Sequence, residues 1–119
     1  MKTIFLLLCV TFSSLVLFSQ EATIDSKVNF LKDKELGKFE FNLPFDSKQE
    51  AVDQYAKYYI NYFTVDFSET SHIVKISMIE NSQENRKIII RFLGANQIQN
   101  VVIDKRSYTL LDFYTNFLQ

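Results

Sequence analysis

His72 is the one histidine in the chain, and its imidazole has the widest chemical scope of any side chain present. It could act as a general acid or base, or bind a metal ion, if further histidines or well-spaced carboxylates surrounded it. Glu69 and Glu80 accompany it in sequence only, and His72 falls at the edge of a predicted strand. We therefore expect a partly exposed histidine at a strand end, and no catalytic residue, metal or cofactor.

Paired carboxylates offer a second kind of chemistry, because two acids that face each other can cleave glycosidic bonds. This possibility defines an alternative function, a small hydrolase acting on envelope polymers. A phosphate-binding loop is excluded because the chain has only two, isolated, glycines. The sequence favours a protein that is not an enzyme. The acids from which a hydrolase pair would come are Asp66, Glu69, Glu80 and Glu84.

Three basic residues form a candidate binding patch. In the strand register predicted below, Lys75 lies directly opposite Arg91, and Lys87 lies nearby on the same sheet face. Like charges opposite each other are mildly destabilising, so a solvated face is the plain alternative. As a binding site, this patch would suit an anionic ligand or an acidic loop of a partner protein.

Tyrosines form a second candidate patch, on the flank of a predicted long helix. Tyr58 and Tyr62 are four residues apart, with Tyr55 beside them. Tyrosine is favoured at interfaces because it contributes a large contact area at little cost in conformational entropy. Together the two patches favour a non-enzymatic binding or protein-interaction module.

A self-associating structural subunit is a further alternative, because the second face of the predicted sheet is half apolar. A homodimer could form by burying that face. Its apolar positions are Ile73, Ile79, Ile89, Leu93, Ile98 and Val102.

The first twenty residues have the pattern of a secretory signal peptide, with Lys2 before an apolar run over residues 4–18 and charged sequence after it. We predict cleavage after Ser19 or Gln20 and a periplasmic or secreted protein, typical of a bacterial Sec substrate. A retained membrane anchor is the alternative, although this run is shorter than the about 20 apolar residues that span a bilayer. Lipidation at Cys9 is disfavoured because the cysteine lies in the middle of the apolar run.

Residues 21–119 are predicted to form a single domain. Cleavage would remove the only cysteine, so no disulfide would stabilise this domain, and its hydrophobic core would have to do so. The formal net charge is −1, and no basic stripe is present, which argues against nucleic acid as a partner.

Hydrophobic periodicity predicts an α+β domain with the order (α)-β-α-β-β-β-α, in which a long helix packs on an antiparallel sheet of three or four strands. A short helix ended by Gly37, or an extended stretch, is expected within 21–36, and a strand over 39–43. The long helix is expected over 48–63, with Ser47 and Glu50 as its capping box. Strands over 72–80, 86–93 and 98–104 and a helix from Ser107 to the end follow. Two hairpins would then align one apolar wall, made of Val74, Ile76, Met78, Ile88, Ile90, Phe92, Val101 and Ile103.

Overall fold

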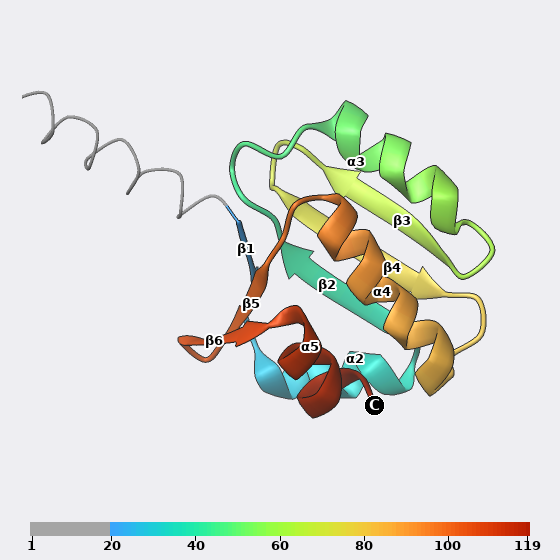
Figure 1. The fold of residues 1–119 in the computed structure, drawn as a ribbon, viewed down its shortest axis with the longest axis vertical. Helices are drawn as coiled ribbons and strands as arrows, with labels where there is room; N and C mark the ends of the chain where they lie inside the picture. The colour runs from blue at the N-terminus through green and yellow to red at the C-terminus, as the bar shows by residue number, and fades with distance from the viewer. Residues whose placement is uncertain (1–19) are drawn as a thin grey trace, which may run out of the picture.

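The backbone forms a six-stranded mixed sheet, with α3 and α4 lying in front of it in the view of Figure 1. The computed structural model describes residues 20–119, so the predicted signal peptide lies outside the described residues except for Gln20. The strand order is β3-β4-β2-β1-β5-β6, in which β1 and β5 are parallel and the other neighbours are antiparallel. The predicted α+β class is confirmed.

The elements of the described chain are β1 (Glu21–Ile24), α2 (Lys27–Glu35), β2 (Lys38–Asn42), α3 (Gln49–Ala56), the 3₁₀-helix η2 (Lys57–Tyr59), β3 (Phe63–Ser68), β4 (Ile73–Met78), α4 (Gln83–Ala95), β5 (Asn100–Ile103), β6 (Arg106–Thr109), α5 (Leu110–Phe113) and the π-helix η3 (Tyr114–Leu118).

Alternation along the strands determines which sheet face is covered. Phe39 and Phe41 of β2 are buried, whereas Lys38 and Glu40 point to the other face and are exposed. The helices cover the phenylalanine face. Phe30 of α2 lies with its ring centroid 5.6 Å from that of Phe39 and 6.0 Å from that of Phe41.

The other helices contact the same face. Phe113 of α5 lies 5.9 Å from the Phe41 ring, and Phe92 of α4 lies 5.8 Å from the Phe63 ring of β3. These buried rings belong to one hydrophobic core, which also takes in Val52 of α3. Within residues 20–119, the opposite face, which carries the side chains between the buried positions, stays open.

The sheet consists of two three-stranded parts that meet at a narrow junction. β1 and β2 are paired at Thr23 and Asn42 and then diverge. α2 connects them and lies in the wedge-shaped opening, with Phe30 only 4% exposed. Of the two alternatives expected within 21–36, a helix forms, over Lys27–Glu35 with Leu36 as its C-cap, and Gly37 follows with a left-handed φ of +71°. The residues before it form β1.

The predicted architecture, a three- or four-stranded antiparallel sheet packed by a long helix, is wrong. Its largest error is the strand expected over 86–93, which is part of α4. Three consecutive isoleucines at 88–90 favour a strand, but the helix begins with its own cap, because Ser82 Oγ accepts a hydrogen bond from the Asn85 N–H at 3.1 Å. Ile89, Phe92 and Leu93 are then buried at helical spacing. Only four members of the predicted wall are buried on the sheet, namely Val74, Ile76, Val101 and Ile103.

The helix expected over 48–63 is also wrong in its second half. α3 ends at Ala56, and Phe63–Ser68 forms β3, in which Phe63 and Phe67 alternate with exposed residues. The predicted capping box is not formed. The N-cap is Lys48, and the Gln49 N–H donates instead to Glu69 Oε1 at 3.1 Å, from the β3–β4 turn. Tertiary contact has replaced the local cap.

The C-terminal region contains a strand that the sequence did not predict. Asp104 and Lys105 have φ values of +51° and +66°, as a two-residue hairpin turn requires, and this turn pairs β6 with β5. Ser107 therefore lies in a strand, and the helix starts later. Thr109 caps α5 by accepting a hydrogen bond from the Asp112 N–H at 3.2 Å.

Candidate functional site

Three adjoining hollows cross the open face of the sheet and form a single groove. Their volumes are about 220, 310 and 160 Å³, and Glu40 lines all three. Asp33 is shared by the first and second hollows, and Lys75 by the second and third. The groove therefore runs from α2 and the end of β1, across β2 and β4, to the β3–β4 hairpin.

The first hollow lies in the wedge between β1 and β2. Asn42 ties the two sides together, because its Nδ2 donates to Asp25 Oδ1 at 2.9 Å and to the main-chain oxygen of Thr23 at 3.2 Å. Ser26 caps α2 at the rim, accepting from the Asn29 N–H at 3.2 Å. These contacts fix polar side chains along one wall, as a recognition site requires.

A row of alternating charge crosses the middle of the groove. Glu40 is the register partner of Lys75, and Lys75 is in turn the partner of Asp66. Neighbouring strands lie about 4.8 Å apart, so Lys75 is the middle residue of three charged neighbours on one sheet face.

The lining as a whole is acidic, since four carboxylates face two amines: Asp25, Asp33, Glu40, Asp66, Lys38 and Lys75. Such a surface can bind cationic and hydrogen-bonding groups.

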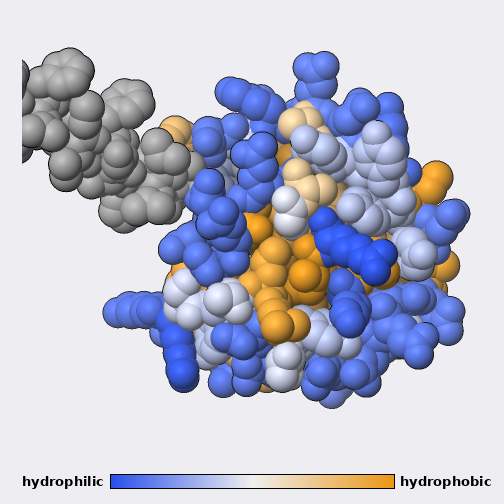
Figure 2. Space-filling view, in the orientation of Figure 1, coloured by the Kyte–Doolittle hydropathy of each residue, from blue (hydrophilic) through white to orange (hydrophobic). Residues whose placement is uncertain are grey.

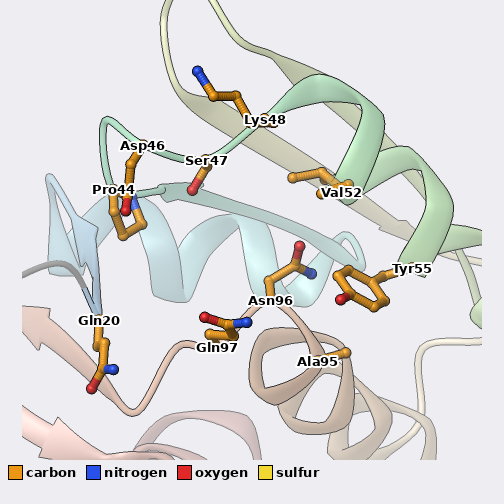
Figure 3. A pocket seen from close by; sticks show the side chains of 11 residues that line it. Gln20, Pro44, Asp46, Ser47, Lys48, Val52, Tyr55, Ala95, Asn96 and Gln97 are labelled. Atoms are coloured by element: carbon orange, nitrogen blue, oxygen red, sulfur yellow. The ribbon is translucent and has the colours of Figure 1, made fainter.

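A separate hollow of about 190 Å³ lies between the start of α3 and the end of α4 (Figure 3). Tyr55 and Asn96 project toward it, whereas the Lys48 side chain points away. Gln97 ends α4 with a left-handed φ of +65°, and its N–H donates to the Gly94 carbonyl at 2.9 Å. This cleft is small and offers mainly neutral polar groups, so we take the longer groove as the candidate site.

The structure does not bring the three predicted basic residues together. Lys75 lies on the open face of β4, between the buried Val74 and Ile76. Lys87 and Arg91 belong to α4, which packs on the opposite face, and Lys87 Nζ lies 5.6 Å from the centre of the Tyr114 ring. The expected patch depended on pairing residues 86–93 as a strand, and that pairing is wrong.

The three predicted tyrosines differ in exposure and in the segment that carries them. Tyr55 is half-buried on α3 at the small cleft, whereas Tyr58 and Tyr62 are exposed after α3 has ended. Their binding role stays a prediction, and Tyr58 and Tyr62 are both exposed.

The carboxylates considered for hydrolysis do not converge. Glu69 precedes β4 and Glu80 follows it, and this strand is about 20 Å long at the usual rise per residue. Glu84 belongs to α4, while Asp66 lies on the open sheet face beside Lys75. Among these four acids, the described chain therefore forms no facing pair.

His72 is half-buried in the turn before β4, as its predicted position at a strand end implies. Its φ is +60°, and its carbonyl accepts a hydrogen bond from the Leu43 N–H at 2.8 Å. Its Nδ1 is buried without a partner among the described residues. Across those residues, no group of histidines, cysteines and carboxylates is arranged to hold a metal ion. His72 is thus placed as a turn residue.

A cationic cluster on the far side of α2 has a structural role. Burial lowers the pKa of Lys34, and the nearby charge of Arg86 lowers it further. Lys34 Nζ donates to the main-chain oxygen of Gln119, and Arg86 Nε to that of Leu118, both at 2.7 Å. Asn81 Nδ2 donates to the Lys34 carbonyl at 2.9 Å. The cluster holds η3 against α2 and α4.

Comparisons of the chain with protein-family models, with curated proteins and with solved structures each found no match. Within residues 20–119, no helix has the length and hydrophobicity needed to cross a bilayer. The function must therefore be inferred from the geometry of the chain itself.

Sequence reasoning missed most of the groove, although part of its signal was visible. The alternation of Phe39 and Phe41 with Glu40 and Asn42 already placed the polar pair on one sheet face. What was missing was the neighbour of that strand. The register with β4 brings Lys75 beside Glu40, and only long-range pairing determines that register.

Proposed function

We propose that this protein is an exported, non-enzymatic binding module that holds a cationic segment of a partner protein in the groove on its open sheet face. The observation that carries the proposal is the groove itself, in which three hollows share Glu40 and follow one path across the sheet. Open faces of antiparallel sheets are normally solvated, but adjoining hollows with polar side chains held by hydrogen bonds at one end are a recognition feature.

The charges of the groove favour a basic partner over the anionic ligand that the sequence suggested. Its lining carries four carboxylates and two amines, and Lys75 is the register partner of both Glu40 and Asp66. A lysine or arginine side chain of the partner would meet Asp25, Asp33 and Glu40 together in the first hollow. Complementary charge also steers association, so binding should weaken as ionic strength rises.

Titration with a synthetic peptide of alternating lysine and serine, followed by NMR, tests this assignment. We expect the largest chemical-shift changes at Asp33, Glu40 and Asn42. The double variant Asp33→Asn and Glu40→Gln keeps side-chain shape but removes both charges, and it should weaken binding about tenfold, the effect of losing about 1.4 kcal/mol.

The matched control is Glu50→Gln with Asp53→Asn on α3. Both residues are exposed on the helical side, and the pair changes net charge by the same amount. If this control weakens the peptide as much as the groove variant does, net charge alone governs binding and the groove is not the site.

Export is tested separately, by expressing the full chain in a bacterium and measuring the mass of the purified protein. We expect processing after Ser19, because the Gln20 carbonyl accepts a hydrogen bond from the Gln99 N–H at 2.9 Å and so continues the β1–β5 pairing. Leu7→Arg should interrupt the apolar run and leave the unprocessed chain in the cytoplasm. An unprocessed, cytoplasmic wild-type chain would contradict export.

A further inference from the structure

Five large apolar side chains are exposed around one end of the sheet, at the far end of β4 from His72. Between 37% and 72% of the surface of each residue is accessible. In Figure 2, hydrophobic surface emerges at the right-hand rim, where the α3–β3 turn and the end of β4 lie in Figure 1. We name this set the end patch. It consists of Leu36, Tyr58, Ile60, Tyr62 and Ile79.

Main-chain contacts place three members of the end patch in a row. The Ile79 N–H donates to the Tyr62 carbonyl at 3.0 Å, which continues the β3–β4 pairing by one residue. On the other side of β4, the Met78 N–H donates to the Gly37 carbonyl at 2.7 Å, so Leu36 follows in the same direction. Tyr62, Ile79 and Leu36 therefore extend the ends of three neighbouring strands.

The remaining two members precede Tyr62 in a tight turn. The Tyr62 N–H donates to the Tyr59 carbonyl at 2.9 Å, which places Ile60 at the corner of that turn. The Tyr59 ring points inward and stacks on Phe63 at 5.9 Å. Tyr58, immediately before it, is left outside. The five residues thus lie close together around one end of the sheet, and none of them belongs to the buried core.

The area of the end patch matches what a dimer interface needs. A large side chain presents about 150–250 Å² when fully exposed, so the five exposed fractions amount to roughly 500 Å² on one copy. Two such patches that covered each other completely would bury about 1,000 Å² of mostly apolar surface, the lower bound for a specific interface before any polar rim is added. A surface of this size is also at the upper end of what a monomer normally exposes.

The charges beside the patch are arranged so that the patch complements itself. Lys57 precedes Tyr58 at one end, while Glu35 precedes Leu36 and Glu80 follows Ile79 at the other, and all three charged residues are exposed. A two-fold axis near Tyr62 would bring the basic end of one copy to the acidic end of the other.

We propose that the end patch is the interface of a two-fold homodimer, with Lys57 of each copy facing Glu80 and Glu35 of the other. The interface is independent of the groove, so either assignment can fail alone. It also differs from the apolar surface that the sequence suggested, because Ile89, Leu93 and Ile98 are buried in the core.

Sedimentation equilibrium of the chain purified after full-length expression tests the proposal. We expect a concentration-dependent dimer, and Ile79→Asp should raise its dissociation constant at least about tenfold by placing a charge in the apolar contact. Leu111→Asp is the matched control. Leu111 is an equally exposed apolar residue on α5, outside the patch, and its replacement should leave the constant unchanged.

Charge exchange tests the two-fold arrangement. Lys57→Glu and Glu80→Lys should each raise the dissociation constant, whereas the double variant should return it to within about threefold of the original value. Far-UV circular dichroism of each variant distinguishes lost association from lost folding. A monomer at millimolar concentration, or equal weakening by Leu111→Asp, would overturn the interface, and failure of the double variant to recover would overturn the proposed orientation.

Discussion

Replacing Phe30 tests the central feature of this fold, the helix that lies in the wedge between the two parts of the sheet. The side chain is 4% exposed, and its ring lies within 6.0 Å of the rings of Phe39, Phe41 and Phe113. Phe30→Ala would remove the atoms that join α2 to both β2 and α5, and the surrounding rings could collapse only partly into the space.

The expected cost is about 4 kcal/mol in the free energy of unfolding, the middle of the range for phenylalanine-to-alanine changes in a core. A domain of this size has a total stability of about 5–15 kcal/mol, so the loss is a large fraction of it. The melting temperature should fall by roughly 15–30 °C. Phe30→Leu keeps most of the volume and should cost about 1–1.5 kcal/mol.

Urea unfolding followed by circular dichroism measures these changes, and Val28→Ala is the control. Val28 lies on the same helix but is 77% exposed, so its replacement should change the free energy by about 0.5 kcal/mol or less. If Phe30→Ala costs no more than Val28→Ala, α2 does not pack in the wedge, and the first hollow of the groove loses its floor.

Two further predictions concern the chain near α2. Gly37→Ala should destabilise the domain by about 1–2 kcal/mol, because φ is +71° and the new Cβ would lie 3.3 Å from Met78 Cβ. Gly94→Ala in α4 has room for the new Cβ and should stabilise the domain by about 0.5–1 kcal/mol. Thermal melts of the two variants measure this difference. Burial, followed by the charge of Arg86, lowers the pKa of Lys34 below 10.5, so at alkaline pH the unfolded chain binds more protons than the folded chain. Relative to Lys34→Met, the wild-type unfolding free energy should therefore rise as the pH is raised toward 10.5, which urea titrations at several alkaline pH values measure.

The groove shows how much of a functional surface local sequence pattern can predict. The alternation in β2 indicated correctly that Glu40 and Asn42 share a face. It could not indicate that β4 would lie beside β2 rather than beside residues 86–93, because an isoleucine run fits either a buried strand or one side of a helix. Because residues 83–95 form α4 and not a strand, Lys87 and Arg91 do not lie beside Lys75. The register partners of Lys75 are the carboxylate residues Glu40 and Asp66.

The end patch shows the same limit of sequence-based prediction, because the neighbours of its tyrosines come from other segments. Tyr58 and Tyr62 were selected for the chemistry of their side chains, which the sequence states directly. Their neighbours Ile79 and Leu36 come from the ends of β4 and the α2–β2 turn, far away in the chain. No periodicity within one segment can show that these residues meet.

Taken alone, the sequence determined the α+β class and the strands β2, β4 and β5, because these depend on alternation within a few residues. Tertiary structure decided that β1 would join two half-sheets, that 83–95 would be a helix, and which sheet face would remain open. Those outcomes depend on which apolar surfaces bury each other across long stretches of chain, and short-range periodicity carries no information about that choice.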